Sequence, residues 1–372
     1  MKIDTLLVKV ASQCNINCSY CYVYNMGDDG WKDMPALISR DTIAALGAAL
    51  KEFTAGQSAP FAVVLHGGEP LMMGARRLRY LFESLRASLP IEHVVCMQTN
   101  GMLISEEILD ICEAYRVSLS VSLDGPRQTN DKFRIGKKSE STFDKVIAGI
   151  EKLRVHPSSK FLFAGVLSVI DPTSDPAEVY LFLKNLGAPS MDFLYRDGNH
   201  TNLPFGKDKF DSVEYGQWLA GLLDVYLADS SPVRIRFLDD LIKLSLGGQG
   251  IKEGLGQSEY GIAVIETDGS ISKNDTLKSS FAGADKFQAP WSVQKNSLKS
   301  VFDSAEFEEY HALQTPTSSE CQSCPQLRIC GGGMPLHRWK DGSSFNNPSV
   351  YCHDQQFIIK KINQKLVAEG AM

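Results

Sequence analysis

The sequence predicts an α/β fold in which parallel strands alternate with helices, and three observations lead to this prediction. Short apolar runs of strand length recur six times in the first 195 residues. Amphipathic stretches with helical periodicity separate them. The apolar runs are nearly continuous, which is typical of strands buried on both faces. Such repeats favour a partial (β/α)6 TIM-like barrel, although an open doubly wound sheet gives the same alternation.

The expected elements follow one another in regular order. Each strand candidate is a short apolar run, and each helix candidate places apolar residues three or four positions apart. Strands are expected at residues 5–11, 62–66, 93–98, 118–123, 161–169 and 191–195, with helices between them at 40–53, 76–87, 105–115, 142–154 and 175–186.

The pattern changes after residue 195. A linker is expected to lead into a helix over 212–227, and the alternation stops at Pro232. An Asp268-Gly269 pair between apolar residues predicts a hairpin over 261–273, because Asp-Gly suits a tight hairpin turn. A region rich in glycine, serine and cysteine follows. The closing helix is expected at 355–366, and the two expected domains are residues 1–230 and 231–372.

Composition excludes several classes of protein. The chain has 372 residues and a net charge of −6, which argues against a broad nucleic-acid-binding surface. Charges interrupt the first ten residues, so no secretion signal is expected, and no apolar run reaches the ~20 residues of a membrane span. We therefore expect a soluble cytoplasmic protein whose nine cysteines are reduced. Cys96 and Cys112 stand in apolar surroundings and are expected in the core.

Cys14, Cys18 and Cys21 form the most informative pattern in the chain, with the spacing C-x3-C-x2-C. Three thiolates can hold three irons of a [4Fe–4S] cluster and leave the fourth iron open. A structural metal site normally closes its coordination with a fourth protein ligand, whereas a catalytic site keeps one position open. The alternative is a zinc knuckle or a set of buried thiols.

Glycine-rich and polar segments follow the first four predicted strands. Ligands in parallel α/β folds bind at the carboxyl ends of the strands. An active site is therefore expected at this edge, independently of any family. The segments are Cys14 to Cys21, Gly67-Gly68-Glu69-Pro70, Gln98-Thr99-Asn100-Gly101 and Ser122-Leu123-Asp124-Gly125-Pro126.

The cysteine triad with Tyr20 and Tyr22, together with the Gly67–Pro70 run, resembles the radical S-adenosylmethionine (SAM) superfamily. The resemblance implies a cluster whose open iron is chelated by SAM and whose electron cleaves SAM to a 5′-deoxyadenosyl radical. It assigns Gly68 and Glu69 to the SAM ammonium, Ser122 to its carboxylate or ribose, and Arg134 to its carboxylate. Asn100, Asp124 and Tyr20 are expected in the same pocket. The structural alternatives are a turn cap for Asp124, a surface arginine at 134 and a satisfied core histidine at His66.

Cys321, Cys324, Cys330 and Cys352 form a second group. Their spacing permits either zinc or a second [4Fe–4S] cluster. The run from Cys324 to Gly333 resembles the SPASM extension, which carries auxiliary clusters in peptide-modifying radical SAM enzymes. A full SPASM domain has seven cysteines, but Asn274 and Ser258 stand where two further ones would be expected. We therefore predict one auxiliary cluster, held by these four cysteines.

Strings at 264–278, 330–338 and 345–352 are similar to the FxsB-type radical SAM/SPASM group. That resemblance implies a maturase of ribosomally made precursor peptides that joins an aromatic ring carbon to a β-carbon in a three-residue cyclophane. Asp275 is predicted to be the general base, with an Asx-turn role as the alternative. Thioether formation, epimerisation and anaerobic sulfatase maturation, which yields formylglycine, are alternative activities. A non-catalytic cluster protein is the other alternative.

Two kinds of partner are expected. The first is a precursor peptide, and the second is an electron donor such as a flavodoxin or ferredoxin. With thirteen residues before Cys14, leader recognition is expected elsewhere in the chain, and residues 196–255 show no recognisable pattern. His337 and Tyr351 are weaker candidates for substrate contact, with packing as the alternative.

Overall fold

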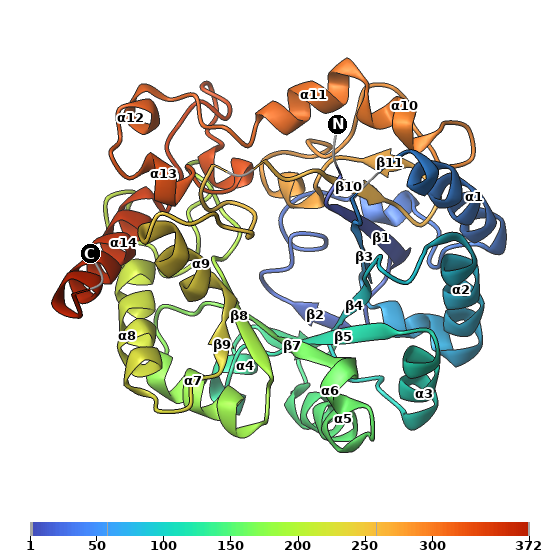
Figure 1. The fold of residues 1–372 in the computed structure, drawn as a ribbon, viewed down its shortest axis with the longest axis horizontal. Coiled ribbons are helices and arrows are strands. Elements are labelled where there is room, and N and C mark those ends of the chain that lie inside the picture. Colours follow the sequence, from blue (N-terminus) through green and yellow to red (C-terminus); the bar gives the residue numbers. More distant parts are fainter. Residues whose placement is uncertain (1–2, 58, 258, 371–372) are drawn as a thin grey trace. The chain divides into compact units, whose positions relative to one another are not determined.

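The computed structural model describes residues 3–57, 59–257 and 259–370, so Ser258 lies outside the described residues. Its contacts divide the chain into two compact units, each of which combines segments distant in sequence (Figure 1). Unit 1 comprises Met1–Ser122, Asp131–Gly165 and Tyr260–His311, and unit 2 comprises Leu123–Asn130, Val166–Glu259 and Ala312–Met372.

Unit 1 is built on a sheet in the order β11-β10-β1-β3-β4-β5. Neighbouring strands from β10 to β5 are parallel, and β11 returns antiparallel against β10 across the Asp268-Gly269 turn. The predicted hairpin is therefore confirmed, and its first strand extends the parallel sheet beside β1. The strands are β1 Thr5–Ala11, β3 Ala62–Gly67, β4 Val95–Thr99, β5 Val117–Ser122, β10 Ile262–Ile265 and β11 Ile271–Ser272.

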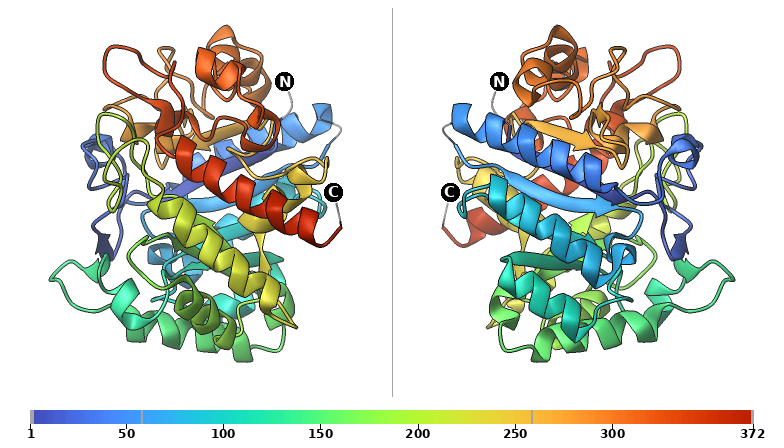
Figure 2. Two further views of the ribbon diagram at one scale, coloured as in Figure 1. Left: turned by 90° about the vertical axis from the view of Figure 1, so that its left-hand side faces the viewer. Right: turned by 90° about the vertical axis from the view of Figure 1, so that its right-hand side faces the viewer.

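Helices cover the outer face of this sheet, and α1, α2 and α3 lie side by side (Figure 2). In α1 the side chains of Ile43, Leu46 and Leu50 are buried at helical spacing, and Ser39 caps the first turn by accepting the Thr42 N–H. The helices of unit 1 are α1 Arg40–Gly56, α2 Gly74–Ser88, α3 Glu106–Ala114, α5 Phe143–Val155, α6 Ser159–Leu162, α10 Leu298–Phe302 and α11 Ala305–Ala312; β2 Ile16–Cys18 and β6 Arg134–Gly136 form a separate antiparallel pair.

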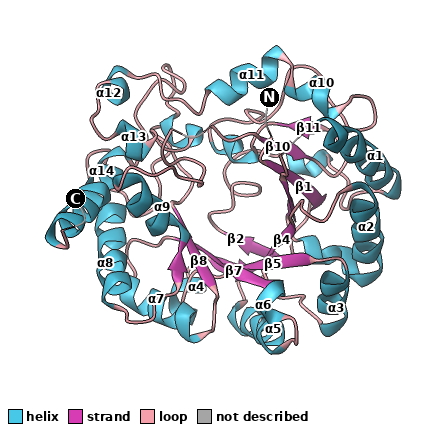
Figure 3. Ribbon diagram, in the orientation of Figure 1, coloured by secondary structure: helices cyan, strands magenta, loops and turns pink. Residues whose placement is uncertain are grey.

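Unit 2 contains the parallel strands β7, β8 and β9 and a group of packed helices. Helix α14 packs against α8 and α9, while the short α12 and α13 are set among loops (Figure 3). The buried Asp354 ties α14 to α8, because its carboxylate binds Lys207 Nζ at 2.6 Å and the Gly216 N–H at 2.8 Å. The elements are β7 Phe163–Val169, β8 Ser190–Leu194, β9 Arg234–Ile235, α4 Arg127–Asn130, α7 Pro176–Asn185, α8 Glu214–Ala228, α9 Arg236–Ser245, α12 Ser319–Gln322, α13 Leu327–Cys330 and α14 Cys352–Ala368.

All six predicted strands are present, and their bounds differ by a few residues at most. One expectation is wrong: the alternation does not stop at Pro232, because β9 and α9 add a further βα unit. A strand of two residues carries too little periodicity to be seen in a sequence. Among the described helices, none combines the length and apolar character that crossing a bilayer requires. The predicted domain boundary at residue 230 stays a prediction.

Candidate active site

The N-terminal cysteines gather at the carboxyl end of β1. Cys14 lies in the loop after this strand, Cys18 ends β2, and Cys21 follows in a turn whose N–H donates to the Cys18 carbonyl at 3.0 Å. The three thiols are close enough to interact electrostatically with one another. The loop therefore brings the triad together, as the spacing predicted.

The surroundings of these thiols fit a metal cluster. Burial raises the pKa of Cys14 to about 11 and that of Cys21 to about 12, and a bound metal ion would reverse this by stabilising the thiolates. Three thiolates on one zinc would lie about 4 Å apart, given a Zn–S bond of about 2.3 Å. Of the residues that the structure describes, only Asp110, Glu113 and His156 bring three ligand atoms within 4.8 Å of one another. The sulfur atoms within each cysteine group therefore do not all lie this close together, and a [4Fe–4S] cluster needs a wider spacing than a single metal ion.

The backbone after β3 passes very close to the cysteine loop. A Cβ on Gly68 would lie 2.2 Å from the Gln13 carbonyl oxygen and 2.1 Å from Tyr24 Oη, so no side chain fits there. The next N–H, that of Glu69, donates to the same Gln13 carbonyl at 2.9 Å. Glycine at 68 is therefore required by close packing against the loop that carries Cys14.

Glu69 is a buried carboxylate, 1% exposed, held by three donors. Its Oε1 accepts from the Leu71 N–H at 2.9 Å and Thr99 Oγ1 at 2.7 Å, and Oε2 accepts from the Asn100 N–H at 2.8 Å. Burial nevertheless raises its pKa above the ordinary value. A cationic ligand would restore the ionised form, so the site fits the ammonium group expected from the resemblance.

Asn100 joins the end of β4 to the cysteine loop. Its Nδ2 donates to Asn15 Oδ1 at 2.7 Å and lies 3.8 Å from Cys14 Sγ. The Asn100 side chain therefore reaches Cys14, the first of the three predicted cluster ligands. Asn15 was not singled out from the sequence, because only the folded loop gives it this role.

The two polar residues after β5 fall in different units. Ser122 ends β5 in unit 1, and its Oγ accepts from Gln98 Nε2 at 2.7 Å. Asp124 lies in unit 2, where its Oδ1 accepts the Val169 N–H at 3.1 Å and its carbonyl accepts from Ser168 Oγ at 3.3 Å. Asp124 therefore fixes the end of β7, a structural role that differs from a simple turn cap.

Arg134 is buried, 7% exposed, so the surface alternative is wrong. It is the first residue of β6, whose register places it opposite Cys18 of β2. Its Nη1 donates to Tyr20 Oη at 2.9 Å. The structure thus brings Tyr20 and Arg134 together beside the cysteine triad.

Asp275 forms the centre of a buried charge network in unit 1. It is 1% exposed, and its Oδ2 lies 3.0 Å from Lys9 Nζ and accepts from Tyr22 Oη at 2.9 Å. Lys9 Nζ also binds Glu266 Oε1 at 3.0 Å. Both of these contacts use Oδ2, so an ammonium group and a phenol hold the same carboxylate oxygen. The arrangement fixes the carboxylate at the centre of the network.

Charge sets the protonation of this network. Burial alone would raise the pKa of Asp275, but Lys9 and then His66 and Lys278 outweigh it and lower the pKa below the ordinary 3.8. Burial lowers the pKa of His66, so its imidazole is neutral at pH 7. His66 pairs with Lys9 in the register of β1 and β3, and its buried Nδ1 has no partner among the described residues. The imidazole is only partly hydrogen-bonded within the described residues, so the prediction of a satisfied core histidine is met only in part.

Lys9 and Glu266 were missed as site residues. A signal for Lys9 existed, since a charge inside the apolar run of a predicted strand is rarely buried without a partner. The partners themselves could not be found, because Asp275 and Glu266 lie in a distant part of the sequence.

The C-terminal cysteines gather within unit 2. Cys321 lies in α12, Cys330 ends α13 and Cys352 begins α14, and Cys324 follows Cys321 in a turn with an N–H···O bond of 3.1 Å. All four interact electrostatically. Burial raises the pKa of Cys330 to about 12 and that of Cys352 to about 11, as for the N-terminal thiols.

Several residues around these cysteines were not predicted. Gln355 Oε1 lies 2.6 Å from Cys330 Sγ, and Gln356 Nε2 lies 3.3 Å from Cys352 Sγ. A Cβ on Gly331 would lie 2.0 Å from the Gly256 carbonyl oxygen, so a glycine is needed where α13 ends. Arg338 is 1% exposed and interacts electrostatically with two of the thiols.

The positions of Asn274, His337 and Tyr351 are also clear. Asn274 Oδ1 accepts the Thr276 N–H at 3.1 Å and so caps the 3₁₀ turn Asp275–Ser279. His337 and Tyr351 are fully enclosed in unit 2, where the Tyr351 hydroxyl donates to the Arg196 carbonyl at 2.5 Å. The packing alternative therefore accounts for His337 and Tyr351.

Known proteins resemble the chain over most of its length. Residues 8–170 match the model of the Radical SAM superfamily. A cysteine-type anaerobic sulfatase-maturating enzyme from Clostridium perfringens is 26% identical over 98% of this chain and 97% of the relative. A serine-type anaerobic sulfatase-maturating enzyme from Bacteroides thetaiotaomicron is 23% identical over 89% of this chain and 82% of the relative.

Solved structures agree in fold. Native anSMEcpe with bound AdoMet has a TM-score of 0.82 at 22% identity and covers 99% of both chains. Streptococcus suis SuiB bound to precursor peptide SuiA has a TM-score of 0.62 at 15% identity, covering 94% of this chain and 76% of that chain. The fold thus extends beyond the radical SAM segment into the region of the second cysteine group. With the triad, its glycine turn and the superfamily match on the same residues, this chain is a radical SAM enzyme.

Proposed function

We propose that this enzyme oxidises a cysteine or serine side chain of a polypeptide to formylglycine. The proposal is supported by the full-length likeness to cysteine-type and serine-type sulfatase-maturating enzymes. Within the chain, the proposal is supported by Asp275, a buried ionised carboxylate that Lys9 and Tyr22 hold in place through Oδ2. A reaction that removes a proton from a thiol or hydroxyl needs such a base.

The cofactors follow from the donor sets. Cys14, Cys18 and Cys21 would hold a [4Fe–4S] cluster, and Glu69, Asn100, Ser122 and Arg134 would hold SAM by its charged and ribose groups. When bound, this pair supplies a 5′-deoxyadenosyl radical that removes one hydrogen atom from the substrate Cβ. Glu69 would bind the ammonium and Arg134 the carboxylate, because each offers the opposite charge in a buried place.

Other groups must complete the oxidation by accepting a proton and an electron from the substrate. After the Cβ hydrogen is lost, one proton and one electron must leave the Cβ–S or Cβ–O unit to form a double bond. The Asp275 carboxylate is our candidate acceptor for the proton, with the neutral imidazole of His66 close by. From serine this gives the aldehyde, whereas from cysteine water replaces the sulfur and hydrogen sulfide leaves.

The electron requires an acceptor. Cys321, Cys324, Cys330 and Cys352 would hold one auxiliary cluster suited to this task. We propose one cluster rather than two, because Asn274 serves as a helix cap where the full SPASM pattern has a cysteine. The same shortage of cysteines favours the second candidate function, cyclophane formation between an aromatic ring and a Cβ, which needs the same proton and electron transfers.

One experiment separates the two functions. The anaerobically reconstituted enzyme is incubated with SAM, dithionite and matched peptides that contain either a sulfatase-type cysteine or a repeated aromatic residue, and the products are analysed by mass spectrometry and a hydrazide probe. Exchange of sulfur for oxygen with loss of two hydrogens, and a carbonyl that reacts with the probe, supports formylglycine. Loss of two hydrogens without a reactive carbonyl supports a crosslink and overturns the first proposal.

A further inference from the structure

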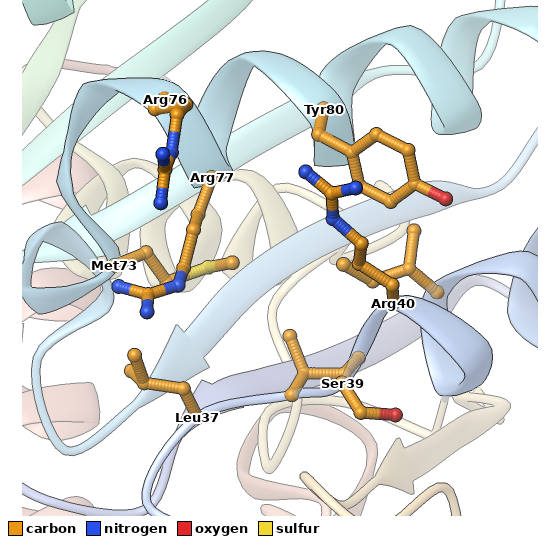
Figure 4. Close-up of a pocket in the computed structure, with 9 residues that line it drawn as sticks. Leu37, Ser39, Arg40, Met73, Arg76, Arg77 and Tyr80 are labelled. Carbon is orange, nitrogen blue, oxygen red and sulfur yellow. The ribbon is translucent and has the colours of Figure 1, made fainter.

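A cavity of about 420 Å³ lies between the first turns of α1 and α2, and none of its lining residues belongs to the charge network around Asp275. Arg40 and Tyr80 line it together with Arg76 and Arg77 (Figure 4). The guanidinium groups of Arg76 and Arg77 reach down from α2, and that of Arg40 rises from α1 beside the Tyr80 ring. Three cations thus border one hollow.

The three arginines are not neutralised within unit 1. No described carboxylate forms an ion pair with Arg40, Arg76 or Arg77, and the contact of Arg40 is a cation–π interaction with Tyr80 at 4.9 Å. Arginine side chains gathered without acidic partners in a chain of net charge −6 form a local positive patch. Such a patch selects a negatively charged partner.

The cavity also has an apolar floor, formed by Leu37, Ile38, Ile43 and Met73. Arginine and tyrosine around an apolar centre are typical of energetically important protein–protein contacts. An arginine can bind a carboxylate through two parallel hydrogen bonds. The chemistry therefore suits an acidic protein surface rather than a simple inorganic anion.

The floor of the cavity is continuous with the cysteine loop. Leu37 pairs with Ala11 in an isolated bridge, the Ile38 N–H donates to the Val10 carbonyl at 3.0 Å, and the Ser12 N–H donates to the Ala36 carbonyl at 3.1 Å. Cys14 follows two residues after Ser12, which is at most about 7 Å of extended chain. A protein seated on the cavity would therefore lie against the segment that leads to the cluster ligands.

We propose that Arg40, Arg76, Arg77 and Tyr80 form the docking surface for a small acidic electron-transfer protein of the flavodoxin class. The inference rests on the proposed radical chemistry, because cleavage of SAM consumes one electron that must come from outside. The donor is oxidised by one electron as SAM accepts it and splits into methionine and the radical. Charge attraction at this surface would speed encounter and orient the donor towards the cysteine loop.

The test compares two reductants on the same enzyme. The variant carries Arg40→Glu, Arg76→Glu and Arg77→Glu, and the control carries Lys51→Glu, Arg79→Glu and Lys160→Glu, three exposed sites that do not line the cavity. Glutamate in the first turn of a helix is favourable, so the variant should fold. Formation of 5′-deoxyadenosine is measured with reduced flavodoxin and with dithionite, and binding of oxidised flavodoxin is measured by calorimetry.

We expect the variant to form 5′-deoxyadenosine at least tenfold more slowly with flavodoxin and at the wild-type rate with dithionite. Its Kd for flavodoxin should rise at least tenfold at low salt, and the difference should shrink as salt is added. The control should match the wild type with both reductants. An unchanged rate and Kd with flavodoxin overturns the docking proposal.

Two further outcomes also overturn it. An equal slowing with both reductants would assign the arginines to the fold or the cluster. Weaker binding of the peptide substrate with normal reduction by flavodoxin would assign them to substrate recognition. If the wild-type enzyme fails to cleave SAM even with dithionite, the proposed radical function is wrong. The measurement with flavodoxin alone could not distinguish this result from a failure of docking.

Discussion

Arg134 lies opposite Cys18 in the antiparallel pair that β2 and β6 form, although the two residues are far apart in the sequence. This pairing places a buried guanidinium next to Cys18, a predicted cluster ligand, and the Tyr20 hydroxyl accepts one of its hydrogen bonds at 2.9 Å. A fixed cation beside three thiolates is well placed to meet the carboxylate of a ligand bound at the cluster.

We expect Arg134→Gln to weaken SAM binding roughly tenfold to a hundredfold, since a hydrogen bond to a charged group contributes about 1.5–3 kcal/mol. Calorimetry on reconstituted enzyme measures the Kd, and iron analysis checks that the cluster remains. Arg154→Gln, on the exposed face of α5, is the matched control. An unchanged Kd would return Arg134 to a structural role.

Glu69→Gln should weaken SAM binding by a similar factor while the fold is kept. Glutamine retains an oxygen for the Leu71 and Thr99 donors, but it loses the charge that attracts an ammonium group. The measurement is again the Kd for SAM, with a S-adenosylmethionine analogue that lacks the amino group as a second ligand. If both ligands lose affinity equally, Glu69 does not bind the ammonium.

Asp275→Asn should separate SAM cleavage from product formation. The radical can still form, but without the proton acceptor the rate of product formation should fall about 10²- to 10⁴-fold. The control is Glu266→Gln, which removes the other carboxylate bound to Lys9 and leaves Asp275 in place. The amounts of 5′-deoxyadenosine and of modified peptide are both measured by liquid chromatography. Equal loss of product in the two variants would show that only the charge network matters.

The burial of His337 predicts that the free energy of unfolding depends on pH. Burial lowers its pKa from 6.5 to about 3, so between these values the unfolded chain binds a proton that the folded chain does not. The contribution to stability is complete above pH 6.5 and falls as the pH drops, by about 1.4 kcal/mol per pH unit.

The thermal midpoint of the wild type should therefore fall further between pH 7.5 and 5.5 than that of His337→Gln. His353→Gln, at the start of α14, controls for the loss of a histidine and should behave as the wild type. Parallel decline of all three proteins would rule out His337 as the titrating group.

The two cysteine groups should be separable. Cys18→Ala should abolish SAM cleavage, whereas Cys330→Ala should lower iron content but leave formation of 5′-deoxyadenosine intact and reduce peptide product. Cys112→Ala, in the core, controls for loss of a buried thiol. Zinc in place of iron at either group, measured by plasma emission on protein purified without oxygen, would contradict the cluster assignment.

Much of the fold and the cysteine site could be predicted because the evidence for them is local. Strand and helix periods repeat over short windows, and C-x3-C-x2-C spacing is a property of eight consecutive residues. The hairpin at Asp268-Gly269 was found for the same reason, since its turn chemistry lies in two residues. The pair β9 and α9 was missed because β9 contains two residues.

The role of His66 shows the limit of this reasoning. From the sequence it is a histidine before a glycine turn, and a satisfied core residue was the better expectation. Its neighbours Lys9 and Asp275 come from β1 and from the turn after β11, which only strand order brings beside it. The same holds for Arg134, whose burial depends on the pairing of β6 with β2.

The sequence by itself determined which chemistry this chain carries, because thiolate spacing, glycine turns and strand periodicity are written over a few adjacent residues. Tertiary structure alone decided how that chemistry is tuned. Burial and charge from distant segments set the protonation of Asp275, the fit of Gly68 against the Gln13 carbonyl and the exposure of Arg134. Electrostatic energy depends on distance in space and on the exclusion of water, and neither quantity can be read along a chain.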